Sequence, residues 1–114
     1  MADELFTREP LDMNPENTSG WKTTLDKIIV RIRKTKETSA GGIHIPEEAR
    51  TKEENFDNIG LVVDMGPHTY SGVKPECAVG DVVMLDRYAG QLFDGDDGHK
   101  YRLVSDRMIL CVKK

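Results

Sequence analysis

The chain has few cysteines, few aromatic residues and no long apolar run, and each scarcity removes a class of protein. Two cysteines occur among 114 residues and do not form a CxxC pair, which does not fit a disulfide-rich secreted scaffold. Aromatic residues make up only 6% of the sequence, which argues against a surface that stacks on nucleic-acid bases. No apolar run approaches the roughly 20 residues of a membrane span. The N-terminus is acidic and has no apolar stretch, so we expect no signal peptide and a cytoplasmic protein.

Size and charge narrow the choice further. A length of 114 residues predicts one domain with a modest core, to which partner subunits could add buried surface. Cys111 lies in an apolar segment and is predicted to be a small buried side chain. The net charge is −4, so the chain has no electrostatic reason to bind nucleic acid or an anionic membrane.

The residues that usually carry catalysis or bind metals are scattered. His44, His68 and His99 show no metal-ligand spacing. Ser71 lacks the G-x-S-x-G context of an activated nucleophile. The acidic turn at 94–98 lacks the closing glutamate of a calcium loop and is interpreted as a solvated hairpin turn. No glycine-rich phosphate loop is present, so the sequence predicts neither an enzyme nor a bound metal.

Apolar residues alternate with other residues over short segments, as in half-buried strands. Ile28, Val30 and Ile32 share one face of the first such segment. Arg31 and Arg33 lie on its other face, which we predict to be solvated. The predicted strands lie near residues 28–32, 59–65, 82–85, 91–93, 100–104 and 108–112. Short strands, frequent turns and no long helical period predict an all-β barrel or sandwich.

The first 20 residues are predicted to be a separate flexible extension. They contain two prolines and several Asn, Ser and Gly residues, with no sustained period. Four apolar residues leave a docking role open: Leu5, Phe6, Leu11 and Trp21.

A polar arm at about 34–57 carries the most informative pattern. Gly41 and Gly42 disfavour helix and strand because glycine loses much backbone freedom on ordering. Ile43 and Ile45 would point to the same side of an extended segment, with His44 between them. A flexible arm that ends in two isoleucines is a poor core element and predicts a docking element.

This arm resembles the mobile loop of the GroES-like co-chaperonins. In that family the loop carries Ser-Ala-Gly-Gly-Ile and two further apolar residues, and here residues 39–45 read SAGGIHI. Four other motifs of the family follow in the expected order: LDKIIV at 25–30, VGDVV at 79–83, RYAG at 87–90 and DRMIL at 106–110. Each motif alone is weak, but five in order cover most of the chain.

The resemblance implies a fold and a function. Residues 21–114 would form a small irregular β-barrel of the GroES-like type with a long mobile loop at about 34–57. Seven copies would form a ring-shaped lid over a GroEL-type chaperonin and enclose unfolded client protein. Gly41, Gly42, Ile43, His44 and Ile45 would contact the chaperonin, which binds the ATP, so the chain itself would hold no cofactor.

The resemblance also implies that the first and last strands join neighbouring subunits. We expect both to be edge strands, whose unpaired backbone groups need cover. The predicted subunit-interface residues are Ile28, Val30, Ile32, Met108, Leu110 and Val112.

Three features depart from the family. His44 replaces an aliphatic residue, the roof loop at about 66–75 is short enough to predict a reduced hairpin, and residues 1–20 are additional. These departures are typical of a divergent member, such as one encoded by a bacterial virus and acting in the host cytoplasm.

Two other functions remain open at this stage. One is a free-standing β-barrel binding module unrelated to chaperonins, such as an oligonucleotide-binding barrel. The other is the GroES-like domain of a medium-chain dehydrogenase, for which no dinucleotide-binding domain is present in this sequence. A sizing column separates the first from a ring.

Overall fold

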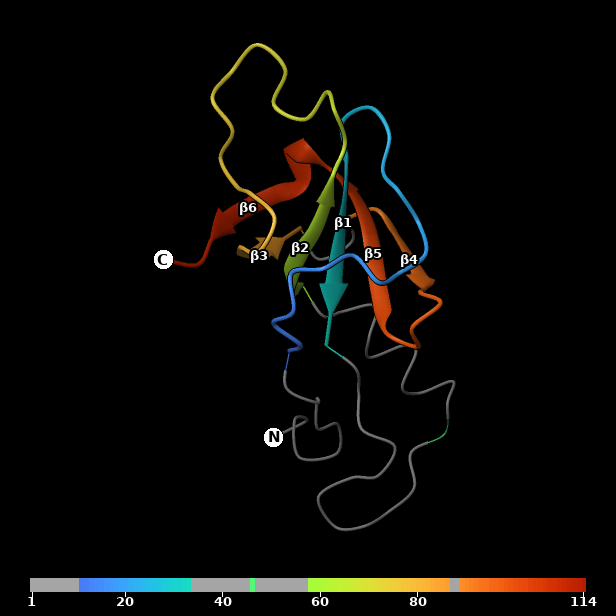
Figure 1. Cartoon of the computed structure of the whole chain (residues 1–114). Coiled ribbons are helices and arrows are strands. Elements are labelled where there is room, and N and C mark those ends of the chain that lie inside the picture. Colours follow the sequence, from blue (N-terminus) through green and yellow to red (C-terminus); the bar gives the residue numbers. More distant parts are fainter. Residues whose placement is uncertain (1–10, 34–45, 47–57, 87–88) are drawn as a thin grey trace.

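The computed structural model describes residues 11–33, 46, 58–86 and 89–114 (Figure 1). Apart from one turn of 3₁₀ helix, η2 at Asp106–Met108, its regular elements are strands, which confirms the all-β prediction. No helix in this part of the chain has the length and apolar character needed to cross a membrane. The strands are β1 Lys27–Ile32, β2 Ile59–Met65, β3 Val82–Leu85, β4 Gln91–Asp94, β5 Lys100–Ser105 and β6 Ile109–Val112.

The six strands form one antiparallel sheet in the order β4-β5-β1-β2-β3-β6. Among the described residues the sheet curls but does not close, because the strands at its two ends, β4 and β6, each pair on one side only. The expected GroES-like barrel is therefore an open sheet. The connection between β1 and β2 starts and finishes on neighbouring strands, where Ile32 is paired with Gly60.

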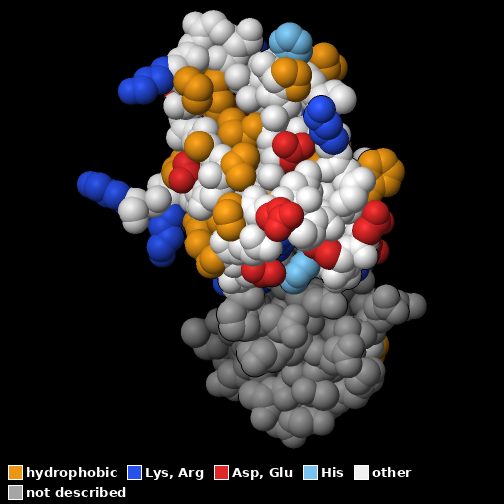
Figure 2. All heavy atoms as spheres, viewed as in Figure 1, with side chains coloured by type: hydrophobic (Ala, Val, Ile, Leu, Met, Phe, Trp, Pro, Cys, Tyr) orange, Lys and Arg blue, Asp and Glu red, His pale blue; other side chains and the backbone are white. Residues whose placement is uncertain are grey.

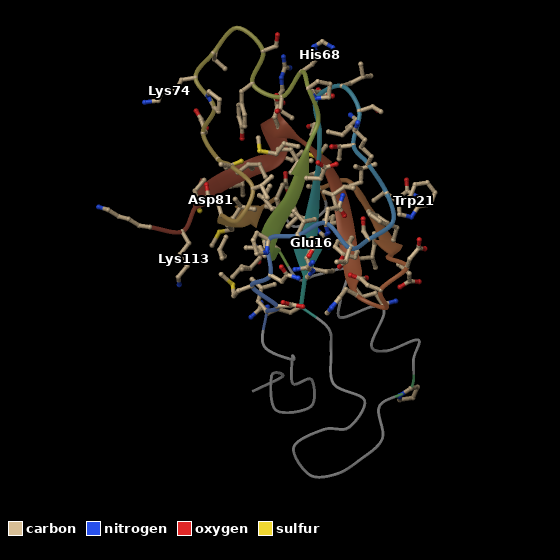
Figure 3. All side chains as sticks on the ribbon, viewed as in Figure 1. Glu16, Trp21, His68, Lys74, Asp81 and Lys113 are labelled. Carbon is tan, nitrogen blue, oxygen red and sulfur yellow. The ribbon has the colours of Figure 1, made fainter. Side chains whose placement is uncertain are left out.

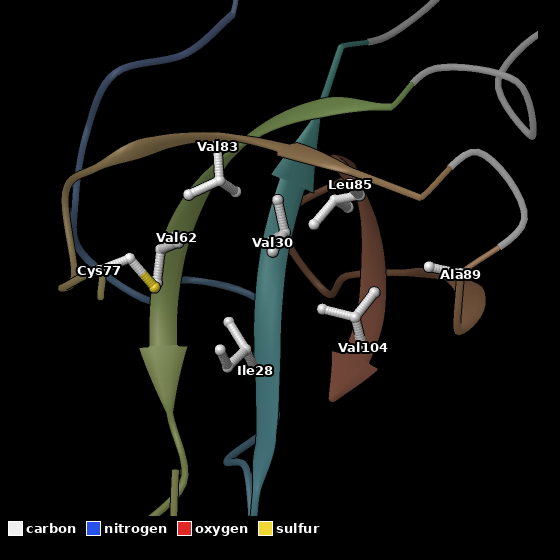
Figure 4. Close-up of a cluster of buried hydrophobic side chains, with 8 residues drawn as sticks. All are labelled: Ile28, Val30, Val62, Cys77, Val83, Leu85, Ala89 and Val104. Atoms are coloured by element: carbon white, nitrogen blue, oxygen red, sulfur yellow. The ribbon is translucent and has the colours of Figure 1, made fainter. Parts of the chain in front are cut away.

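The main core lies on one face of the sheet. Ile28 and Val30 of β1 meet side chains from β2, β3 and β5, and Cys77 reaches the same cluster from the connection between β2 and β3 (Figure 4). The cluster consists of Ile28, Val30, Val62, Cys77, Val83, Leu85, Ala89 and Val104. These short, mostly β-branched side chains suit a curled sheet because they pack well on a pleated surface.

The other face of the sheet carries a second apolar cluster. It is built from Ile29, Leu61, Val63 and Tyr101, with Leu11 from the N-terminal segment packed against it. The first strand is thus buried on both faces, and the expectation of a solvated face at Arg31 is wrong: this side chain is only 1% exposed.

The expectation that β1 is an edge strand is also wrong. It pairs with β5 on one side and β2 on the other, so its backbone groups have partners within the chain. Ile28, Val30 and Ile32 are buried in the same subunit and are not free to meet a neighbour. The sequence pattern identified the strand but not its place in the sheet.

The last strand does lie at an edge. β6 pairs only with β3, and Leu110 is 61% exposed. Met108 and Val112 are half-buried. Cys111 is exposed, so its predicted burial is wrong, because it lies on the outer side of this edge strand.

The segment 66–81, which contains the expected roof loop, forms turns and no strand. Tyr70 ties it to the sheet from a left-handed backbone conformation with φ of 54°. Its backbone N–H donates to the Asp106 carboxylate at 2.7 Å, and its hydroxyl lies 3.5 Å from the Cys77 sulfur. Burial raises the pKa of both the Tyr70 hydroxyl and the Cys77 thiol, so both stay protonated at neutral pH.

The burial of Ile28 in the main core predicts that this side chain contributes to stability. Ile28→Ala should reduce the free energy of unfolding by about 2–5 kcal/mol, because it leaves a cavity in the main core. Leu110→Ala is the control on an exposed apolar position and should change it by about 0.5 kcal/mol or less. Urea denaturation of dilute protein measures both. Equal losses in the two variants would contradict the assignment of Ile28 to the core.

Candidate functional site

The predicted chaperonin-binding residues lie outside the described residues. Gly41, Gly42, Ile43, His44 and Ile45 all belong to the connection between β1 and β2. The structure fixes only where this connection begins and ends, on the two hydrogen-bonded strands β1 and β2 in the middle of the sheet. Their contact with a chaperonin therefore remains a prediction.

A groove lies at the flank of the sheet formed by β4 and β5. It has a volume of about 280 Å³, and Trp21, which is 62% exposed, forms part of its wall. The groove is mostly apolar. Its lining residues are Trp21, Lys22, Ile29, Gln91, Phe93, Asp94 and Leu103.

The opposite flank carries the edge strand β6. Leu110 is exposed there, and a second hollow of about 230 Å³ runs along β6 and β3. Figure 3 shows Trp21 and Lys113, the residue after β6, on opposite sides of the sheet. Apolar side chains lie toward both sides of the face seen in Figure 2, with acidic side chains between them. The two flanks thus present different apolar surfaces.

The N-terminal segment crosses the face between these flanks. Residues 11–20 run in front of β2, β1 and β5 in Figure 1 and were predicted to be flexible. The structure places residues 11–20 against the sheet through specific hydrogen bonds, and their flexibility remains a prediction. We call residues 11–19 the strap.

Arg31 holds the strap in place through main-chain oxygens. Its Nη1 donates to the carbonyls of Asp12 at 3.2 Å and Asn14 at 2.5 Å, and its Nη2 donates to the carbonyl of Glu16 at 3.0 Å. Nη2 also lies 3.5 Å from the Thr18 hydroxyl. A buried guanidinium is strongly unfavourable without such acceptors, so strap and arginine depend on each other.

Tyr101 connects this cation to the β4–β5 turn. The Arg31 guanidinium lies 5.6 Å from the centre of the Tyr101 ring, and its Nε donates to the Tyr101 hydroxyl at 3.3 Å. The Tyr101 hydroxyl in turn donates to the Asp97 carboxylate, which also accepts from the Thr18 hydroxyl. Burial and the bond to Asp97 raise the pKa of Tyr101.

The carboxyl of Asp97 is tuned by these contacts. Partial burial acts to raise its pKa, but hydrogen bonds from Thr18, Tyr101 and the His99 backbone outweigh burial and lower the pKa overall. The ionised form of Asp97 is therefore favoured by the folded arrangement.

The strap ends next to the groove. The Asn17 amide donates to the Trp21 carbonyl at 2.7 Å, and the Ser19 hydroxyl accepts from the Trp21 N–H at 3.2 Å. Ser19 is fully buried, and its carbonyl accepts from the Asp96 N–H at 2.9 Å. Gly20 has φ of +85°, and a Cβ there would collide with the Asp96 side chain. The backbone before Trp21 is thus fixed to the β4–β5 turn.

A second anchor follows the groove. The backbone N–H and the hydroxyl of Thr23 both donate to the Asp64 carboxylate, at 2.8 Å and 2.7 Å. Residues 20–22 therefore bridge two fixed points, and Trp21 stands exposed between them. Sequence reasoning noted Trp21 as apolar but missed Arg31, whose partners are main-chain oxygens and leave no side-chain signal.

The two described histidines, His68 and His99, are not brought together. His68 is exposed beside the turns of segment 66–81, and His99 Nε2 lies 3.3 Å from the Asp12 carboxylate. In the described ranges, no group of three or more His, Cys, Asp or Glu side chains could hold a metal ion.

The Asp97 network predicts a dependence on pH. Because the folded-state pKa is lowered, the stabilisation is fully present above the ordinary aspartate pKa of about 3.9 and is lost as pH falls through the folded value. Asp97→Asn should therefore weaken the acid dependence of unfolding, and Thr18→Val should do so less. Urea denaturation at a series of pH values between neutral and strongly acidic measures this. An unaltered acid profile in Asp97→Asn would refute the role of the network.

Comparison with known proteins agrees with the fold. The family described as chaperonin 10 Kd subunit matches residues 21–113. The co-chaperonin GroES of Chlamydia caviae is 35% identical over 91 residues, covering 78% of this chain and 86% of the relative. The co-chaperonin GroES of Chlamydia pneumoniae is 33% identical with the same coverage. The strap precedes the matched residues. The chain belongs to the chaperonin 10 kDa subunit family of GroES co-chaperonins, which are not enzymes.

Proposed function

We propose that this chain is one subunit of a ring-shaped lid that caps a GroEL-type chaperonin and encloses unfolded client protein. The chaperonin binds the ATP, and this chain needs no cofactor. Family membership supports the co-chaperonin role. The structural observation that carries the ring is the pair of unlike apolar surfaces on opposite flanks of one sheet.

A head-to-tail contact between these flanks would build the ring. Contacts between unlike surfaces repeat from copy to copy and close when the rotation between copies allows it. Strand β6 offers unpaired backbone groups and the exposed Leu110, and the groove beside Trp21 offers an apolar hollow. Met108, Leu110 and Val112 therefore remain proposed interface residues, and the Trp21 groove takes the place of the buried β1 residues. The proposed number of seven subunits in the ring comes from the family resemblance.

The connection between β1 and β2 would supply the chaperonin contact. Burying Ile43 and Ile45 contributes about 3–6 kcal/mol gross, at about 1.5–3 kcal/mol each. Ordering each backbone residue costs about 1–2 kcal/mol, so one arm alone should bind weakly. Several arms on one ring make later contacts intramolecular and restore affinity through avidity. Weak single contacts also allow the lid to leave after each cycle.

The ring contact is tested by Leu110→Glu. A charge placed in an apolar interface without a partner should shift the protein from a ring to a monomer. Val73→Glu is the matched control, because Val73 is also exposed, at 65%, but lies in the turns between β2 and β3. Analytical ultracentrifugation measures the assembly. A Leu110→Glu variant that remains a full ring would overturn this interface, and a monomeric native chain would favour a free-standing binding module.

The chaperonin contact is tested by Ile43→Asp. The ring should assemble normally, but ATP-dependent capping should be lost because the aspartate would enter an apolar groove. Thr51→Asp introduces the same charge in the polar half of the same connection and should still cap. A pull-down with a GroEL-type chaperonin, with and without ATP, measures both. Undiminished capping by Ile43→Asp would defeat the assignment.

A further inference from the structure

The strap raises a question that the family match does not answer, because residues 11–19 precede the matched region. We propose that the strap is a positioning element for the Trp21 groove and that Arg31 is the residue that holds it there. Ring assembly of this chain would then depend on its N-terminal segment. This inference rests on the proposed ring and names a device that prepares its docking surface.

Arg31 binds the strap strongly, and we call this guanidinium with the strap carbonyls that accept from it the clamp. All three nitrogens of the Arg31 guanidinium have acceptors, and most of these are strap carbonyls at alternate positions, 12, 14 and 16. Charge-assisted hydrogen bonds of this kind are roughly twice as strong as neutral ones. Because Arg31 is 1% exposed, water does not compete for the guanidinium. The strap is therefore held mainly through its main-chain carbonyls, by a cation inside the sheet, with side-chain contacts of Leu11, Asp12 and Thr18 added.

Asn17 links the strap to the backbone of Trp21 in the groove. Asn17 lies between the clamp and Trp21: its side-chain oxygen accepts from the Ser19 N–H at 3.1 Å and from the Ser19 hydroxyl at 2.6 Å, and its amide donates to the Trp21 carbonyl. Ser19 then contacts the Trp21 N–H. These hydrogen bonds fix the position of the backbone that carries the Trp21 indole.

Release of the strap would remove some of the contacts that hold the backbone around Trp21. Thr23 stays bound to Asp64 and the Ser19 carbonyl to the Asp96 N–H, but the chain before Trp21 loses the contacts that Asn17 makes with Ser19 and Trp21. The indole then samples more positions, and assembly must order it again. A surface that is ordered before binding avoids this cost, which is the advantage of preorganisation.

Trp21 provides its own probe because it is the one tryptophan in the sequence. Its fluorescence anisotropy and its quenching by acrylamide report the order and exposure of the groove wall. Asn17→Ala breaks the link but leaves the clamp, and Arg31→Met removes the clamp. Glu16→Gln is the control, since it changes a strap charge and keeps the carbonyl that Arg31 binds. Ile28→Val is a second control, which loosens the main core without touching the strap.

We expect Asn17→Ala and Arg31→Met to lower Trp21 anisotropy in the dissociated subunit and to increase acrylamide quenching. The concentration at which the ring dissociates should rise about tenfold, as expected when about 1.4 kcal/mol of preorganisation is lost. Glu16→Gln and Ile28→Val should keep native anisotropy and native assembly. If Arg31→Met does not fold, Asn17→Ala decides, because the Asn17 side chain is only half-buried.

The two possible failures are distinguishable. If the Asn17→Ala variant forms a ring at the native concentration and has native Trp21 anisotropy, the positioning role is overturned. The proposed ring is not affected by that result. A native chain that stays monomeric at high concentration would overturn the ring and with it the assembly role of the strap. Loss of assembly in Ile28→Val to the same extent would show a general effect of stability and would also overturn the positioning role.

Discussion

The buried guanidinium of Arg31 organises one face of this protein. Arg31 lies in the central strand with almost no exposure to water, beside Ile29, Leu61 and Tyr101. A charge in such a place is tolerated only when its donors are satisfied. The chain meets this requirement by bending its own N-terminal segment over the sheet, so that carbonyl oxygens face the guanidinium. The order of the strap, the Tyr101–Asp97 bond and the backbone before Trp21 all follow from it.

The two faces and the two flanks of the sheet have different roles. The face with Ile28 and Val30 is closed by side chains of the same chain and supplies the main core. The opposite face is closed by the strap. The flanks retain accessible apolar surface at Trp21 and at Leu110. A protein divided in this way can keep a stable subunit while its contacts with other copies lie at the ends of the sheet.

The strands were largely predictable because alternation of side chains is a local property. Residues 28–32, 59–65 and 82–85 follow a pattern that is readable without knowing the rest of the chain, and each forms a strand at those positions. Strand order is not local, so the pattern gave no sign that β1 lies between β5 and β2. Ile28, Val30 and Ile32, which were predicted at a subunit interface, are buried inside the sheet for this reason, whereas Leu110 does lie on an exposed edge.

The groove and the clamp were harder to predict. Trp21 stood out in the sequence as an apolar residue beside a polar segment, but its neighbours in the groove come from β1, β4 and β5 and meet only in three dimensions. Arg31 had the spacing of an outward-facing residue, and nothing in its own segment indicates a cover. Three of its acceptors are backbone carbonyls, which every residue type carries, so no composition or motif could have marked the strap as its partner.

The pairing of Ile32 with Gly60 has a consequence for how this protein can change over time. Because the two ends of the β1–β2 connection are held by the sheet, the fold needs only that the intervening chain returns to its starting point. The entropy of closing such a loop grows with the logarithm of its length, about 0.6 kcal/mol for each doubling. Insertions and deletions in the connection should therefore alter its reach at little cost to the sheet. The distance that the connection can span and the stability of the sheet can then evolve almost independently.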